Sequence, residues 1–131
     1  MSSPEEILRR ARTIAVVGAS PRPWRPSNDV MRYLLAAGYR CIPVRPDEDE
    51  VLGVPVVRSL EEIDEPIDVV DVFRRPEFCA DVARAAVAAG ARALWLQAGI
   101  RSGEARSIAE SAGIDYVEDA CTKVVHKVFL A

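Results

Sequence analysis

Apolar positions along the chain follow two spacings that alternate from one end to the other. Short runs rich in Val and Ile are typical of strands, whereas longer stretches with apolar residues at every third or fourth position are typical of helices. Strands that alternate with helices favour a parallel sheet covered on both faces. The pattern therefore predicts an α/β domain with a five-stranded, mainly parallel sheet and helices on both faces.

Five apolar runs are expected to form the main sheet. They are Thr13–Ala19, Tyr39–Val44, Ile67–Phe73, Arg92–Gln97 and Ile114–Val117. Right-handed crossovers between parallel strands predict a doubly wound sheet with the order 3-2-1-4-5, numbered by position along the chain. A small extra strand is expected at Val54–Val57.

Helix-start and helix-stop signals fill the intervals between these strands. Ser3 and Glu6 have the spacing of a capping box, Ser27 is expected to cap the next helix, and Pro76 suits the first position of another. The expected helical segments are Ser3–Arg10, Ser27–Gly38, Ser59–Ile63, Pro76–Gly90 and Ser102–Gly113. The residues from Glu118 onward form a terminal segment without an assigned structure.

Size and composition fit a single domain over residues 1–131. Domains commonly contain about 100 to 150 residues, and 50% of these residues are hydrophobic, enough to form a core. No apolar run approaches the roughly 18 residues of a membrane span, and the first residues lack the apolar segment of a signal peptide. We therefore expect a cytoplasmic protein with no membrane association.

Charge and cysteine content exclude several functional classes. The formal net charge is −3 and no basic stripe is evident, so a nucleic-acid partner is not expected. Cys41, Cys79 and Cys121 lie far apart, which argues against a zinc site or a disulfide framework. His126 is the one histidine, and without an evident partner we expect it to be structural.

Candidate chemistry gathers where the predicted strands end. Parallel sheets bind ligands at the carboxyl ends of their strands, at the point where the strand order reverses. With the expected order, this point lies between the first and the fourth strand. Four segments should therefore converge on one site: Gly18–Asn28, Val44–Pro46, Val72–Pro76 and Gln97–Ser102.

The first of these segments has only part of a dinucleotide-binding turn. Gly18 permits close approach of the backbone to a phosphate, and Ala19 and Ser20 are small enough to do the same. The hydroxyls of Ser20 and Ser27 can donate to phosphate oxygens, and Arg25 offers a planar cation that pairs with phosphate. The segment thus predicts an anionic ligand at a helix N-terminus.

The other segments narrow the choice of ligand class. Arg45 follows the second strand, where an acidic residue would favour NAD, so it suits the phosphorylated ribose of NADP or coenzyme A. Arg74 and Arg75 precede the helix start at Pro76, and one of them is expected to face the ligand. Gln97, the backbone around Gly99, and Ile100 are expected at the end of the fourth strand.

Two aspartates and two tryptophans lie within or near these segments. Asp68 and Asp71 are three apart on one strand, so they point to opposite faces, and we interpret both as structural. Trp95 is expected in the core because it lies within a strand. Trp24 lies in the site loop and is a candidate to cover an adenine or pantetheine group.

Six motifs together resemble the small bacterial and archaeal CoA-binding domain proteins, the YccU-like group. They are "VVGASPRPWRPSNDV", "YRCIPVRP", "VLGVPVVRSLEEI", "DVVDVFRRPE", "ALWLQAGI" and "DACTKVVH", which span nearly the whole chain. The resemblance implies one Rossmann-like domain similar to the CoA-binding domain of the succinyl-CoA synthetase alpha subunit. It also implies that coenzyme A is the ligand.

The resemblance assigns residues to parts of that ligand. Around the phosphates it implies Gly18, Ala19, Ser20, Arg25, Pro26 and Ser27. Near the 3′-phosphate or adenosine it implies Arg45 and Pro46, and along the ligand Phe73, Arg74, Gln97 and Gly99. The chain departs from the family pattern at Arg45, where asparagine is usual, and at Ala120 and Val125, where arginine and glutamate are usual.

The expected function is therefore binding of coenzyme A or an acyl-CoA, without catalytic activity of the chain's own. One alternative is an NADP-binding, oxidoreductase-like domain, and another is a regulatory subunit with a vestigial nucleotide pocket. The expected partner is a small nucleotide ligand, and the sequence leaves open whether the chain also forms a homo-oligomer or binds a protein partner.

Overall fold

The computed structural model describes residues 2–131, so Met1 of the expected domain lies outside them. Five parallel strands form the main sheet, in the order β2-β1-β5-β6-β7. They are β1 (Thr13–Val17), β2 (Arg40–Val44), β5 (Val69–Val72), β6 (Ala93–Leu96) and β7 (Asp115–Val117). The predicted α/β, Rossmann-like class with a five-stranded parallel sheet is confirmed.

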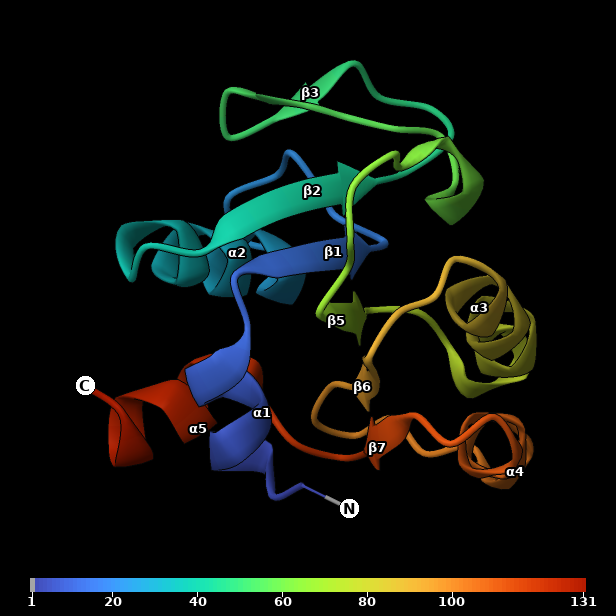
Figure 1. Cartoon of the computed structure of the whole chain (residues 1–131). Helices are drawn as coiled ribbons and strands as arrows, with labels where there is room; N and C mark the ends of the chain where they lie inside the picture. The colour runs from blue at the N-terminus through green and yellow to red at the C-terminus, as the bar shows by residue number, and fades with distance from the viewer. Residues whose placement is uncertain (1) are drawn as a thin grey trace.

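Helices cover both faces of this sheet, as Figure 1 shows. On one face lie α1 (Pro4–Arg10), α2 (Pro26–Ala36) and α5 (Thr122–Phe129), and on the other lie α3 (Pro76–Ala88) and α4 (Gly103–Ser111). Residues alternate between two cores along each strand, so Ile14 packs on the first face and Ala15 on the second. Trp95 is fully buried, as predicted.

Local signals explain where the helices begin. The predicted capping box at α1 is confirmed, because the Ser3 hydroxyl accepts from the Glu6 N–H and the Glu6 carboxylate accepts from the Ser3 N–H. The expected cap of α2 was wrong: Pro26 takes the first helical position and Arg25 is the N-cap. The Ser27 hydroxyl instead accepts from the Ser20 N–H, at 3.0 Å.

The predicted strand order 3-2-1-4-5 was wrong. By position along the chain the order is 2-1-3-4-5, because β5 pairs with β1 and leaves β2 at the edge. Two sequence features explain this arrangement. Pro43 lacks an N–H for a second neighbour and so belongs in an edge strand, whereas Val69–Val72 are buried throughout and suit a central one.

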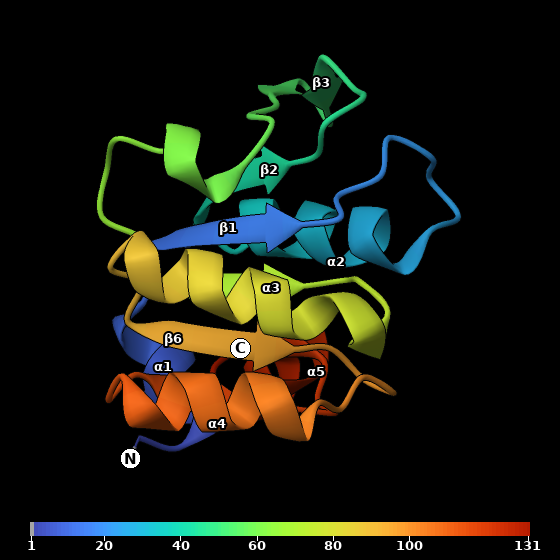
Figure 2. The same cartoon turned by 90° about the vertical axis from the view of Figure 1, so that its right-hand side faces the viewer.

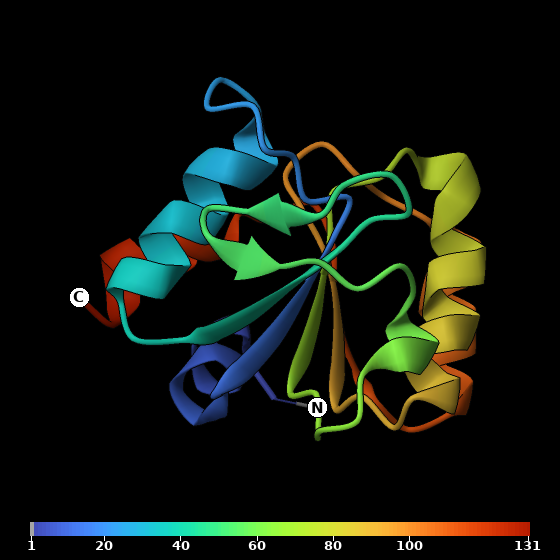
Figure 3. The same cartoon turned by 90° about the horizontal axis from the view of Figure 1, so that it is seen from above.

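The chain between β2 and β5 closes the edge of the sheet beside β2. It forms the hairpin β3 (Glu50–Val51) and β4 (Val54–Pro55), followed by the 3-10 helix η1 (Leu60–Glu62). Val57 makes an isolated parallel bridge to Val44, so the expected strand at Val54–Val57 is shorter than predicted. Seen from above in Figure 3, the hairpin lies over this edge.

The topology collects the functional segments at one end of the sheet. Figure 2 shows the arrows of β1 and β6 pointing to the same end, where the loop after β1 and the start of α3 also lie. The strand order reverses between β1 and β5. The reversal was expected between β1 and β6, the first and fourth strands along the chain, but β5 lies beside β1 instead. Within residues 2–131, no helix has the length and apolar character needed to cross a membrane.

Candidate functional site

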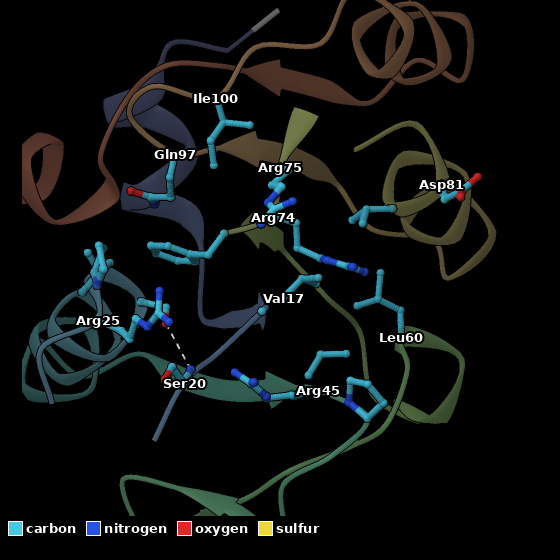
Figure 4. A pocket seen from close by; sticks show the side chains of 18 of the residues that line it. Val17, Ser20, Arg25, Arg45, Leu60, Arg74, Arg75, Asp81, Gln97 and Ile100 are labelled. Carbon is cyan, nitrogen blue, oxygen red and sulfur yellow. Dashed lines mark hydrogen bonds between the residues drawn. The ribbon is translucent and has the colours of Figure 1, made fainter. Parts of the chain in front are cut away.

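A cavity of about 990 Å³ opens at the carboxyl ends of four strands, β2, β1, β5 and β6. Its size lies at the upper end of the roughly 300 to 1,000 Å³ usual for ligand pockets. The N-termini of α2 and α3 contribute Pro26 and Pro76 to its walls. Figure 4 shows the side chains around it, with Arg25 and Arg45 on one side and Gln97 and Ile100 on another.

Gly18 lies where β1 leaves the sheet and touches the end of β5. Its φ is +86°, and an added Cβ would lie 2.7 Å from the Phe73 carbonyl oxygen. Its N–H donates to the Val44 carbonyl at 3.1 Å, which ties the same turn to β2. Glycine is therefore required here by both backbone conformation and space.

The loop after Gly18 is held by its own polar groups. The Asn28 side chain donates to the Ser20 carbonyl at 2.9 Å, and the Arg22 N–H donates to the Ser20 hydroxyl at 3.2 Å. Ser20, Ser27 and Asn28 are all buried. The hydroxyl of Ser27 accepts a loop hydrogen bond, so its own hydrogen is the group left for a phosphate oxygen.

Four arginines form what we call the arginine end of the cavity: Arg22, Arg25, Arg45 and Arg58. Arg45 donates to Asp47 at 2.6 Å and to the Ala19 carbonyl at 3.2 Å. Arg58 donates to the Pro46 carbonyl at 2.8 Å. The hydrogen bond from Arg45 holds the pKa of Asp47 below its usual value. These contacts fix two cations beside the end of β2.

The end of β5 supplies the middle of the cavity. Phe73 lies on its wall, and the Phe73 N–H donates to the Val17 carbonyl at 2.9 Å. The Arg74 guanidinium lies 4.3 Å from the centre of the Phe78 ring, a cation–π contact that orients it. Arg75 is the N-cap residue of α3 and also lines the cavity.

Uncharged residues line the cavity where β6 ends and α5 begins, a part that we call the neutral end: Gln97, Ala98, Ile100 and Cys121. Behind it, the Asp71 carboxylate accepts from the Gln97 side-chain nitrogen at 2.5 Å and from the Thr122 hydroxyl at 3.0 Å. Asp71 is completely buried, and burial raises its pKa to about 7. Asp68 lies elsewhere, where its carboxylate accepts from the backbone N–H groups of Arg12 and Thr13.

The site therefore combines fixed cations at one end with a buried polar network behind the other. A family model described as "CoA binding domain" matches residues 12–127. The chain belongs to this CoA-binding domain family. The fold and the place of the cavity at the strand ends are consistent with that membership.

Members and structural neighbours of the family resemble most of this chain. It is 46% identical to the uncharacterized protein YneT of Bacillus subtilis over 124 residues, which cover 95% of this chain and 92% of YneT. A hypothetical protein from Pyrococcus horikoshii OT3 has a TM-score of 0.94 and 38% identity, covering 99% of this chain and 94% of that one.

A larger enzyme contains the same fold as one part of its chain. Acetyl-coenzyme A synthetase 1 of Ca. Korarchaeum cryptofilum has a TM-score of 0.76 at 24% identity. The match covers 87% of this chain but 27% of the synthetase chain. At this identity the similarity shows a shared fold.

The cavity of this CoA-binding domain gathers most residues predicted for the site. Those that line it are Gly18, Ser20, Arg25, Pro26, Ser27, Arg45, Pro46, Phe73, Arg74, Gln97 and Ile100. Ala19 is buried behind the wall, where its carbonyl accepts from Arg45. Gly99 lies outside the lining, and its N–H donates to Asp119 at 2.7 Å. Trp24 is 75% exposed and does not line the cavity either.

Sequence reasoning missed two groups of lining residues. Arg58, Ser59 and Leu60 reach the cavity from the segment after the hairpin, which follows the edge of β2. Val82 and Ala85 reach it from α3. Their spacing on an apolar helix face indicated burial, but it carried no signal that part of this face borders a ligand cavity.

Proposed function

We propose that this chain binds coenzyme A, or an acyl-CoA, in the cavity at the carboxyl ends of the strands and performs no chemical step of its own. One observation supports this proposal most: a single cavity joins the arginine end to the neutral end. Coenzyme A has the same polarity, with three phosphate groups on its nucleotide and an uncharged pantetheine arm. A ligand of one uniform charge character would leave one end of the cavity unmatched.

Each end has a defined part in this proposal. The turn at Gly18 and the N-terminus of α2, with Arg25, would hold the diphosphate. Arg45 would pair with the 3′-phosphate, with Pro46 and Arg58 beside it. Phe73, Arg74, Gln97 and Ile100 would follow the pantetheine arm. Ala19 and Gly99 would contribute through the backbone geometry that they give to the walls.

The absence of a chemical step is supported by the position of the histidine. His126 lies on α5, with its Nδ1 2.9 Å from the Tyr33 hydroxyl and its ring edge-on to Tyr39. It is not among the residues that line the cavity. Acyl transfer by a base requires that base within hydrogen-bond reach of the reacting group.

Ligand titrations followed by thermal unfolding would test the proposal. A ligand that binds only the native state raises the melting temperature, so CoA and acetyl-CoA should raise it, whereas NAD and NADP should not. Stabilisation by NADP without CoA would support the oxidoreductase-like alternative, which Arg45 at the end of β2 favours. No shift with any of the four would support a vestigial pocket. Mass spectrometry of a co-purified small molecule gives an independent readout.

A further inference from the structure

Behind the neutral end of the cavity lies a buried carboxylate without a cation beside it. Asp71 lies on β5, Gln97 directly after β6 and Thr122 at the start of α5, and all three side chains are buried. The Asp71 carboxylate has hydrogen bonds to Gln97 and Thr122, and no salt bridge reaches it among residues 2–131. A buried carboxylate held only by neutral donors is costly, so its retention needs an explanation.

Counting donors and acceptors fixes how the Gln97 amide is turned. Above its pKa the Asp71 carboxylate is ionised and only accepts, so the Gln97 nitrogen and the Thr122 hydroxyl must both donate to it. The Thr122 oxygen then accepts from the same Gln97 nitrogen, at 2.9 Å. Both hydrogens of that nitrogen are therefore used inside the protein. The Gln97 carbonyl oxygen is the one group of the amide left to act outside this network.

That oxygen is free to bond a group outside the network. It takes part in none of the hydrogen bonds among the described residues. Every fully buried side-chain nitrogen or oxygen among residues 2–131 has a partner, so this oxygen is not fully buried. Gln97 is 4% exposed and lines the cavity, so the small accessible surface of this oxygen is assigned to the cavity.

We propose that Asp71 is a positioning residue that locks the Gln97 amide so that its carbonyl oxygen presents a hydrogen-bond acceptor to the ligand. The ligand must then offer a donor at the neutral end. This inference rests on the proposed function, under which the donor is an amide N–H of the pantetheine arm. Thr122 completes the lock, because its hydroxyl occupies the second hydrogen of the Gln97 nitrogen.

Asn in place of Asp71 would release the lock while keeping the shape of the side chain. An asparagine amide both donates and accepts, so it can pair with either orientation of Gln97. The variant Asp71→Asn should therefore present a mixture of acceptor and donor to the ligand. Asp68→Asn is the matched control, because Asp68 carries the same substitution on a carboxylate that bonds Arg12 and Thr13 instead.

A measurement without ligand tests the lock itself. At pH 8.5, above the pKa of Asp71, the side-chain N–H pair of Gln97 should exchange slowly with solvent in a nitrogen–proton NMR spectrum. Its signal is identified by its loss in Gln97→Met. The exchange should accelerate about tenfold or more in Asp71→Asn and Thr122→Val, but stay slow in Thr122→Ser and Asp68→Asn. Fast exchange in the wild-type protein would overturn the proposal.

Calorimetry with two probes at pH 8.5, where Asp71 is ionised, tests the consequence for binding. Adenosine 3′,5′-bisphosphate carries two of the three phosphates of coenzyme A and lacks the pantetheine arm. Asp71→Asn should weaken CoA about 5- to 50-fold, and leave the bisphosphate within about twofold, because a mismatched polar group then faces the pantetheine arm. Asp68→Asn should leave the ratio of the two affinities unchanged.

The outcomes separate this inference from the proposed function. If the wild-type protein binds CoA but Asp71→Asn weakens both probes equally, or neither, the positioning role is wrong and the proposed function stands. If the wild-type protein does not bind CoA, the proposed function and the pantetheine donor are both wrong, whereas the NMR result still decides whether Asp71 locks the amide. Melting temperatures of each variant identify any that fail to fold.

Discussion

The arginine end and the neutral end of the cavity achieve polarity by different physical means. At the arginine end, charge comes from exposed or half-buried side chains on loops, and two of them are held by the Ala19 and Pro46 carbonyls. At the neutral end, polarity comes from Gln97, whose orientation depends on a carboxylate behind the wall. Salt screens the first kind of interaction strongly and the second much less.

This difference determines which ligand-binding residues can be predicted from the sequence. An arginine that follows a strand predicts a cation at the strand end from its residue type alone. The Asp71 to Thr122 hydrogen bond joins positions 51 apart in the sequence, and neither residue reaches the cavity lining. Recognition at the neutral end is therefore a property of the packed sheet and α5. The following predictions test the two ends separately.

The largest expected effect is at the turn beneath the arginine end. Gly18→Ala should lower the free energy of unfolding by about 3 to 4 kcal/mol, because it adds a clash with Phe73 to the cost of a positive φ. Gly53→Ala is the control, since Gly53 has a φ of +77° and open space around it. It should lose only about 1 to 2 kcal/mol. Urea unfolding measures both, and equal losses would exclude the Phe73 contact as the cause.

The next effect concerns the neutral end and its pH dependence. The pKa of Asp71 is raised from 3.8 to about 7, so the folded protein holds a proton that the unfolded chain releases near pH 4. Stability from this group is therefore lost as pH rises from about 4 to 7. Between pH 5 and pH 7 the wild-type protein should lose about 2 to 3 kcal/mol relative to Asp71→Asn. Parallel stability curves for the two proteins would contradict this assignment.

A binding effect of about 2 kcal/mol is expected from a cation at the arginine end. Arg25→Ala should weaken CoA by that amount, roughly 30-fold, because a charge-assisted hydrogen bond to phosphate is lost. Arg40→Ala is the control, since Arg40 pairs with Glu65 at the start of β2, away from the cavity. Calorimetry at two salt concentrations should also show a shallower salt dependence for Arg25→Ala. Unchanged affinity would remove Arg25 from the site.

The smallest effect should come from the acid that competes for Arg45. Asp47 is largely exposed and accepts from the Arg45 Nε, so its carboxylate opposes a phosphate at the same guanidinium. Asp47→Ala should tighten CoA binding about two- to threefold, within the range of exposed ion pairs. The gain should vanish in an Arg45→Ala background. A gain that persists there would mean that Asp47 acts on the ligand through another group.

Features of the fold that depend on residues close in sequence were predictable, whereas the order of the strands in the sheet was not. The α1 capping box, the start of α3 at Pro76 and the burial of Trp95 depend on short-range patterns, and all three are found. The strand order failed because crossover handedness alone did not specify which neighbour β5 takes. Pro43 carried the missing signal, since a strand that contains proline belongs at an edge.

The site residues also separate into those that the sequence predicted and those that it did not. Segments that follow strands were placed at the cavity because parallel strands end together, and 11 of the 13 predicted residues line it. Arg58 and Leu60 were missed because their position depends on the path of the hairpin along β2. Asp71 was interpreted as structural, and the signal of its network exists only once β5, β6 and α5 are packed together.

The segment that follows the hairpin affects whether the protein can aggregate at high concentration. The Val57 N–H donates to the Pro43 carbonyl and the Val57 carbonyl accepts from Arg45, so this border of the sheet has few free backbone groups. At the other border, β7 is only three residues long. Sheets grow into aggregates by adding strands at open borders. Two borders so poorly suited to a new strand should keep this small domain from polymerising through its sheet.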